Sequence, residues 1–210
     1  MVPIIIGVVV GVIVLIAFVL VGIYNGLVRS RNRVGEAWSG IDVQLRRRAN
    51  LIPNLVETVK GYAGHERETF EEVTRARSMV EQAGSAGEAA GANNMLTTAL
   101  RHLFAVAENY PQLQASQNFM ELQKELSDIE EKIAFARQFY NTNVLDYNNR
   151  IGTIPTSMIA GMFGFTPEEF FEADEEGRAE VRVDFDRDAA PPAAPAGGDS
   201  GAAGGTPASS

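Results

Sequence analysis

The stretch that determines the fold is residues 34–62, which read VGEAWSGIDVQLRRRANLIPNLVETVKGY. Apolar side chains recur there at alternating steps of three and four residues, interrupted by Arg48: Val34, Trp38, Ile41, Leu45, Ile52, Leu55, Val59 and Tyr62. This period places them on one face of an α-helix, in the heptad pattern of a coiled-coil seam. Pro53 lies inside the helix. Because the seam keeps its register across Pro53, we expect a kink there, with Asn50 placed to cap a new turn.

Three further helices are expected beyond Gly61 and Gly64, which break the pattern. They cover residues 65–83, 92–109 and 113–150, with a glycine-containing loop at 84–91 and a stop at Tyr110-Pro111, because the residue before proline avoids helical backbone. The last helix carries a seam that shifts register after Tyr140: Phe119, Leu122, Leu126, Ile129, Ile133, Ala136 and Tyr140, then Val144, Tyr147 and Ile151. A long–short–short–long order predicts an all-α fold, an antiparallel up-down four-helix bundle. A three-helix bundle is the alternative, in which the first two helices are continuous.

The N-terminal segment, residues 1–28, contains no charged side chain, and residues 3–24 are almost purely apolar. About 20 such residues in a helix reach roughly 30 Å, the thickness of the hydrocarbon core of a bilayer. A cleaved signal peptide would have a shorter apolar part behind basic residues and a small-residue cleavage site, whereas this stretch ends VGIYN at residues 21–25. The segment therefore predicts a retained transmembrane helix rather than a signal peptide or a buried core helix.

The residues that follow this helix predict how it sits in the membrane. Tyr24 suits the aromatic belt at the membrane interface, and Arg29, Arg31 and Arg33 follow it. Near anionic headgroups, each arginine adds about 1 kcal/mol of attraction. Basic residues flank the span on its C-terminal side, so the positive-inside rule predicts a single-pass protein of the cell membrane with its bundle in the cytoplasm and its N-terminus outside.

Charge and composition divide the 210 residues into four parts. We expect a transmembrane anchor at 1–28, a helical bundle at 29–166, an acidic extended segment at 167–188 and a disordered Pro/Gly/Ala tail at 189–210. The net charge of −9 resides mostly in the acidic segment, which carries −7, while the bundle carries −1. An acidic chain argues against nucleic-acid binding, and the absence of cysteine excludes disulfides, thiol catalysis and cysteine-ligated metal sites.

Two segments towards the C-terminus each have two interpretations: one is uncharged, and the other alternates apolar and charged side chains. Residues 151–165, IGTIPTSMIAGMFGF, either cap the bundle end or lie in the membrane interface against lipid or a partner's transmembrane helix. In a four-helix bundle, the direction of the last helix returns this segment to the bilayer. Residues 179–185 alternate apolar and charged side chains, so they form either a tethered extended stretch or a strand added to a partner's sheet.

Three long strings in this chain resemble the LemA family. They are YNGLVRSRNRVGEAWSGIDVQLRRRANLIPNLVETVKGYAGHE at 24–66, LTTALRHLFAVAENYPQLQASQNFMELQKELSDIEEKIAFARQFYN at 96–141 and YNNRIGTIPTSMIAGMFGF at 147–165. The resemblance implies an N-terminal membrane anchor followed by a helical bundle. It implies membrane proteins of poorly defined role, with one branch associated with magnetosome membranes, and no agreed enzymatic activity.

Enzymatic motifs are lacking, and we expect no catalytic residues, no metal and no cofactor. Neither His65 nor His102 belongs to an HExxH pattern, and the glycines at 84–91 lack the Lys-Ser/Thr ending of a phosphate loop. Two groups of side chains are candidates for binding a partner: the basic cluster Arg46, Arg47 and Arg48, and the Tyr-Asn pairs Tyr140-Asn141 and Tyr147-Asn148. Each has a purely structural alternative, as a solvated face or as tyrosines and asparagines that join helices.

These observations together favour a non-enzymatic role. We expect a membrane-anchored scaffold or adaptor whose bundle face binds an unidentified membrane or membrane-associated protein, or a second copy of the chain. The competing hypothesis is a regulatory subunit of a membrane hydrolase, or an enzyme with an unrecognised site.

Overall fold

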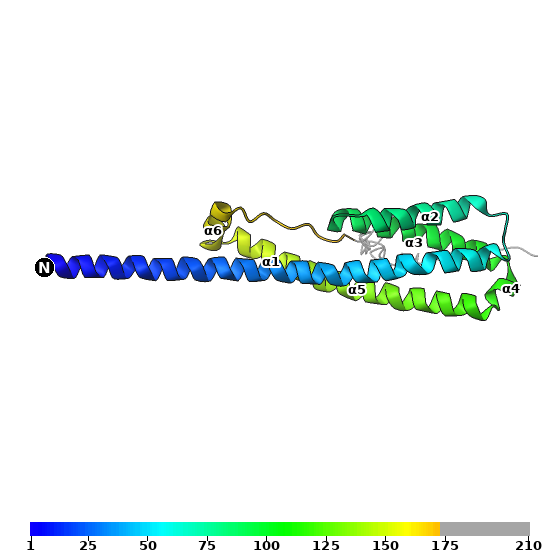
Figure 1. Cartoon of the computed structure of the whole chain (residues 1–210), viewed down its shortest axis with the longest axis horizontal. Helices are drawn as coiled ribbons and strands as arrows, with labels where there is room; N and C mark the ends of the chain where they lie inside the picture. The colour runs from blue at the N-terminus through cyan, green and yellow to red at the C-terminus, as the bar shows by residue number, and fades with distance from the viewer. Residues whose placement is uncertain (173–210) are drawn as a thin grey trace, which may run out of the picture. The chain divides into compact units, whose positions relative to one another are not determined.

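The computed structural model describes residues 1–172, so the predictions for the remainder of the acidic segment, for residues 179–185 and for the tail at 189–210 lie outside the described residues. The described part of the chain is all-α, as predicted, and contains no strand (Figure 1). Its helices are α1 (Val2–Lys60), α2 (Arg67–Gln82), α3 (Ala86–Glu108), α4 (Pro111–Gln114), α5 (Gln117–Gly152) and α6 (Thr156–Phe163).

Helix α1 is a single continuous helix that joins the apolar N-terminal segment to the bundle. Its 59 residues would extend about 90 Å at 1.5 Å per residue. The N-terminal part is long and apolar enough to cross a membrane, and its side chains are exposed from Val2 to Leu20. In Figure 1 this part projects beyond the other helices. The boundary predicted at residue 28 therefore falls within a helix and not within a linker.

Pro53 lies within α1 without ending it, and Asn50 is an interior residue of the helix rather than the cap of a new turn. Proline has no N–H, so it leaves the carbonyl four residues earlier, that of Ala49, without its usual helical donor. Ala49 is buried, and Arg77 of α2 donates a hydrogen bond from Nε to the Ala49 carbonyl at 3.1 Å. A neighbouring helix thus satisfies the acceptor that the proline leaves free.

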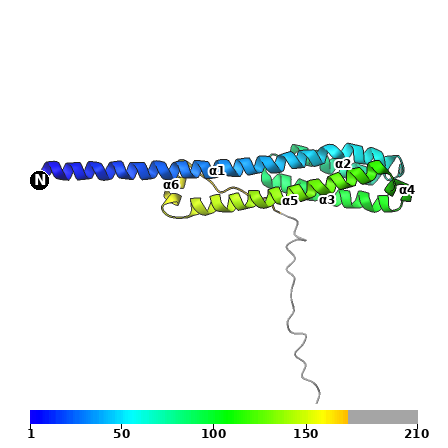
Figure 2. The same ribbon diagram turned by 90° about the horizontal axis from the view of Figure 1, so that it is seen from below.

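The bundle has the predicted up-down order. α2 and α3 lie against the half of α1 that is remote from the N-terminus, and α5 runs back alongside α1 (Figures 1 and 2). The three-helix alternative is wrong, because α1 ends at Lys60 and the chain turns before α2 begins at Arg67. The predicted seams form the core. The buried seam residues include Ile41, Leu45, Ile52, Leu55, Val59, Phe119, Leu126, Ile129, Ile133, Tyr140, Val144 and Tyr147. Tyr62 is an exception: it is 44% exposed because it lies in the turn after α1.

Helix α3 begins six residues earlier than predicted, so Gly87 and Gly91 lie inside the helix rather than in a loop. The cause is a variant of the capping box, in which the glutamate binds the residue before the N-cap Ser85. The Ser85 hydroxyl accepts a hydrogen bond from the Glu88 N–H at 3.2 Å, and the Glu88 carboxylate accepts one from the Gly84 N–H at 2.9 Å. These local bonds stabilise the first turn by more than the glycines weaken it.

The segment predicted as one helix from residue 113 to 150 is interrupted at its start. Pro111 opens the short helix α4, where its fixed φ suits a first turn, and the buried Leu113 holds that turn against the core. Ser116 is extended, with φ −68° and ψ 125°, and α5 starts after it. The predicted seam then follows α5 to its end at Gly152.

After α5 the chain forms α6 and then an extended segment, residues 165–172, which we call the strap. α6 ends at Gly164, whose φ of 71° is a left-handed conformation that glycine adopts without the steric cost of a side chain. The strap runs back along the bundle, and its Phe171 is buried in the core. Packing therefore continues beyond residue 166, where the sequence placed the end of the bundle.

Candidate functional site

The two Tyr-Asn pairs of α5 lie on one face of the helix, because positions seven residues apart are two turns apart. Asn141 donates from its amide nitrogen to the Phe171 carbonyl at 3.0 Å, and its amide oxygen accepts from the Phe171 N–H at 2.9 Å. Asn148 makes the same pair of bonds with Glu168 of the strap, both at 3.0 Å. Each asparagine thus binds the N–H and the C=O of one strap residue.

The tyrosines of these pairs bind the same strap. The Tyr140 hydroxyl donates to the Glu169 carbonyl at 2.8 Å, and the Tyr147 hydroxyl donates to the Thr166 carbonyl at 3.0 Å. Burial raises the pKa of Tyr140 to about 12, with smaller contributions from the charges of Glu168 and Glu169. Burial likewise raises the pKa of Tyr147. Residues predicted as a partner surface are therefore engaged by a segment of the same chain.

A groove of about 860 Å³ lies between α1, the turn before α3 and the strap. Its wall combines the Trp38 ring with charged side chains, among them Arg31 and Glu168, whose Nε and Oε1 atoms are 3.5 Å apart. Trp38 also lies 5.8 Å from the Tyr140 ring and 6.4 Å from the Phe171 ring, measured between centroids. One aromatic contact therefore joins the strap to α1, and another joins α1 to α5.

The three arginines of the basic cluster have different environments. Arg46 binds Asp42 one turn earlier at 2.9 Å and is exposed, and Arg47 binds Glu125 of α5 at 2.9 Å and is also exposed. Arg48 is only 5% exposed, so it is part of the bundle interior and not of an accessible basic patch.

Buried Arg48 joins three helices. One of its terminal nitrogens donates to the Asn93 side-chain oxygen at 2.7 Å and to the Thr97 hydroxyl at 3.1 Å, and the other lies 3.0 Å from the Glu130 carboxylate. Burial lowers the pKa of Arg48, and the charge of Glu130 opposes that effect. The polar interruption of the seam is therefore a buried arginine that pairs with the half-exposed Glu130 and donates hydrogen bonds to two residues of α3.

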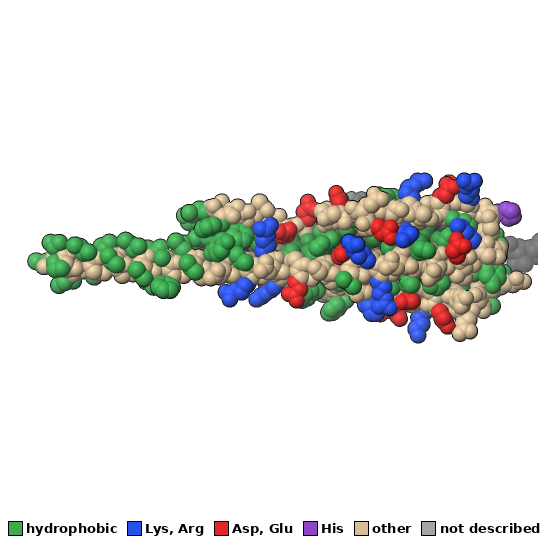
Figure 3. Space-filling view, viewed as in Figure 1, with side chains coloured by type: hydrophobic (Ala, Val, Ile, Leu, Met, Phe, Trp, Pro, Cys, Tyr) green, Lys and Arg blue, Asp and Glu red, His purple; other side chains and the backbone are tan. Residues whose placement is uncertain are grey.

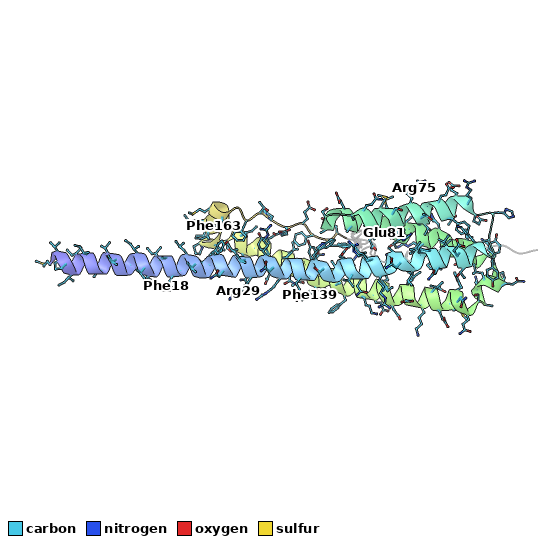
Figure 4. The ribbon with its side chains drawn as sticks, in the orientation of Figure 1. Phe18, Arg29, Arg75, Glu81, Phe139 and Phe163 are labelled. Atoms are coloured by element: carbon cyan, nitrogen blue, oxygen red, sulfur yellow. The ribbon has the colours of Figure 1, made fainter. Side chains whose placement is uncertain are left out.

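The side chains predicted at the membrane interface lie where α6 meets α1. Tyr24 contacts two rings of the returning chain: its centroid is 4.9 Å from that of Phe163 and 5.8 Å from that of Phe165. Arg29 and Arg33 are exposed on α1. Figure 4 shows Arg29 and Phe163 at neighbouring positions along α1, on opposite sides of it.

An exposed aromatic pair on α5 was not identified from the sequence. Phe135 is 75% exposed and Phe139, one turn further on, is 55% exposed. They border a groove of about 750 Å³ whose wall includes Glu36, Asp128 and Lys132. In Figure 4, Phe139 projects from α5 on the side away from α2. The signal in the sequence is that two phenylalanines stand outside the buried seam, where a solvated bundle carries polar residues.

The histidines and acidic side chains of the described residues do not gather around a common point. Within residues 1–172, no group of three or more His, Cys, Asp or Glu residues is placed to hold a metal ion. His102 lies 3.0 Å from the Glu72 carboxylate, and His65 is exposed before the start of α2.

The fold defines a class of protein: a helical bundle whose first helix continues into a candidate membrane-spanning segment. The chain belongs to the LemA family, because the model of that family matches residues 37–185. It is 29% identical to Protein LemA of Metamycoplasma hominis over 168 residues, covering 78% of this chain and 75% of that protein. It is also 29% identical to Magnetosome protein MamQ of Magnetospirillum gryphiswaldense over 185 residues, covering 75% and 68%.

Proposed function

We propose that this protein is a single-pass, membrane-anchored scaffold that presents one face of its bundle to other proteins, without catalysing a reaction. The observation that carries the proposal is the continuity of α1, which runs from the candidate span through the bundle core without a linker. A bundle joined to its anchor by a continuous helix keeps a defined distance and orientation relative to the membrane. Geometry of that kind suits a protein that positions others.

The exposed Phe135 and Phe139 support a protein-binding face on α5. Aromatic side chains are enriched in the centres of protein interfaces, and charged residues such as Glu36 and Lys132 beside this pair would form the rim. The relatives named magnetosome protein are consistent with a role at a membrane surface, which we extend to this chain as part of the proposal. The positive-inside rule, applied to Arg29, Arg31 and Arg33, supports a cytoplasmic bundle as part of this proposal.

Membrane anchoring and sidedness are tested first. The full chain should stay in the membrane pellet after carbonate extraction. A C-terminal tag should resist protease added to intact cells and become sensitive once the cells are opened. A chain released by carbonate would contradict the anchor, and digestion of the tag on intact cells would reverse the orientation.

The protein-binding face is tested by photocrosslinking in native membranes. A photoreactive amino acid at position 139 should yield a discrete crosslinked protein, and the same amino acid at position 75 is the control, because Arg75 lies on α2, on the opposite side of the bundle (Figure 4). Phe135→Ser should weaken the crosslink at position 139 if the aromatic pair forms the face. Equal crosslinking at both positions, or none at 139, would contradict the scaffold proposal. A crosslinked band of twice the chain mass would identify a second copy as the partner.

A further inference from the structure

The depth at which α1 leaves a bilayer is defined by the order of its side chains. The uninterrupted apolar run ends at Ile23, Tyr24-Asn25 begins the amphipathic part, and Arg29 is the first charge. The six steps from Ile23 to Arg29 span about 9 Å of helix, which is comparable to the thickness of the headgroup region between hydrocarbon and water. The interface therefore lies between Ile23 and Arg29 if α1 is the anchor proposed above, and the inference that follows rests on that proposal.

Helix α6 packs against this interval of α1. Buried Leu27 forms a small apolar cluster with Ile159 and Ala160 of α6, and Ile23 packs against that cluster. The contacts of Tyr24 with Phe163 and Phe165 extend the same junction. Because these contacts involve residues 23–27, α6 lies at the depth at which the chain leaves the lipid.

The opposite side of α6 is apolar and exposed. Met158 and Met162 of α6 are 69% and 79% exposed, and Ile154, just before α6, is 83% exposed. A surface of this kind on a soluble bundle would be unfavourable in water, and large exposed apolar patches mark binding surfaces. In Figure 3 the green side chains of α6 adjoin those of the N-terminal part of α1, the first blue side chains appear at about the same level on the lower side of α1, and the first red ones appear further toward the bundle.

The charge distribution around α6 favours a lipid surface. Residues 151–167 contain no charged side chain, so the exposed apolar surface is not interrupted by an acidic group that anionic headgroups would repel. Along the chain, Arg29, Arg31 and Arg33 follow the candidate span and Arg150 precedes α6. The nearest acidic residue on the strap, Glu168, is paired with Arg31. An exposed apolar surface without acidic side chains, beside a candidate span that is followed by arginines, fits an interfacial membrane helix.

We propose that α6 is a second membrane contact: the side chains of Met158 and Met162, with that of Ile154 just before the helix, insert into the lipid interface beside the point where α1 leaves the bilayer. Together, α1 and α6 hold the bundle at two points, so the bundle cannot rotate freely about α1. The strap then connects the lipid contact to α5 through Asn148 and Asn141.

The proposal is tested with single cysteines, which are simple to introduce because the chain has none of its own. An environment-sensitive fluorophore is attached to Met162→Cys in the full chain, reconstituted in vesicles of phosphatidylcholine and phosphatidylglycerol. Phe18→Cys reports on the anchor. The matched control is Met120→Cys, another exposed methionine but at the start of α5, far from α6 in sequence. Spin-labelled lipids with the nitroxide near the headgroup or near the chain end serve as shallow and deep quenchers.

The expected result is blue-shifted emission at position 162 with stronger quenching by the shallow than by the deep lipid, deep quenching at position 18, and no quenching at position 120. Quenching at 18 with water-like emission at 162 would overturn the lipid contact and leave the anchor intact. Blue-shifted emission at 162 without quenching would assign the surface to a protein, such as a second copy, and overturn it too. Absence of quenching at 18 would overturn the proposed anchor together with this inference. Ile154→Cys repeats the test at a second position, so a local defect at 162 cannot decide it.

Discussion

The pairing of Pro53 with Arg77 gives a sharp test of the packing between α1 and α2. Pro53 leaves the buried Ala49 carbonyl without a helical donor, and Arg77 supplies one at 3.1 Å. Hydrogen bonds from charged donors contribute about 1.5–3 kcal/mol, so Arg77→Met should lower the free energy of unfolding by about 2 kcal/mol. In a Pro53→Ala background, the backbone N–H gained at position 53 donates a hydrogen bond to the Ala49 carbonyl within α1. Arg77→Met should then lower the free energy of unfolding by only about 0.5 kcal/mol, the value of a surface ion pair.

The difference between the two backgrounds is a coupling free energy of about 1.5 kcal/mol, measured by a double-mutant cycle. The assay is guanidinium unfolding of the full chain in mild detergent, followed by far-ultraviolet circular dichroism, with the slope checked for all four proteins. Arg67→Met is the control, because Arg67 binds Glu71 one turn on, as Arg77 binds Glu81, but is an exposed side chain. Equal costs of Arg77→Met in the two backgrounds would refute the reasoning, because the carbonyl would then not be the group that Arg77 serves.

Three further predictions concern the buried polar groups. Arg48→Met should destabilise the bundle by about 1–3 kcal/mol in the same assay, because it leaves the buried side-chain oxygen of Asn93 without its donor. Arg46→Met, at an exposed pair, should change stability by less than about 0.5 kcal/mol. Asn148→Ala removes two hydrogen bonds to the strap, so hydrogen exchange at the Glu168 amide should accelerate about tenfold or more, equivalent to roughly 1–3 kcal/mol. Unchanged exchange would contradict the conclusion that Asn148 holds the strap. The pKa of Tyr140 is raised from 10.0 to about 12 in the fold, so folding favours the neutral side chain. The stabilisation that this preference gives the fold is complete below pH 10 and is lost as the pH rises towards 12. Tyr140→Phe should therefore reduce the loss of stability over that pH interval by about 1–2 kcal/mol. An identical loss in the wild-type and variant proteins would show that ionisation of Tyr140 does not cause it.

Repeating patterns made the bundle predictable. The apolar period over residues 34–62 and along α5 reports directly on which side of a helix is buried, and the buried residues are nearly those of the seams. Helix ends were less predictable because they depend on balances between local signals. At α3, the hydrogen bonds of Ser85 and Glu88 support a helix start despite two glycines. The Ser-x-x-Glu spacing is present in the sequence, but the prediction of a loop rested on the glycines alone.

The candidate site was predictable as a set of residues but not as an arrangement. Tyr140, Asn141, Tyr147 and Asn148 stood out as a polar group on one helix, yet their ligand is a strap about 20–30 residues further along the chain. An asparagine side chain has the same donor and acceptor groups for a partner's backbone as for its own chain's. Which of the two it binds depends on where α6 directs the chain.

The order of apolar, polar and basic residues along the chain was enough to establish the helices, the buried face of each and the candidate membrane segment, because these depend on interactions between near neighbours at fixed spacing. Tertiary packing decided the rest: that Arg48 lies inside while Arg46 lies outside, that Arg77 serves a carbonyl 28 residues away, and that α6 returns to Tyr24 and Leu27. Those outcomes depend on how whole helices pack against one another. The residues that meet there are far apart along the chain, so no periodic pattern in the sequence reveals their contact.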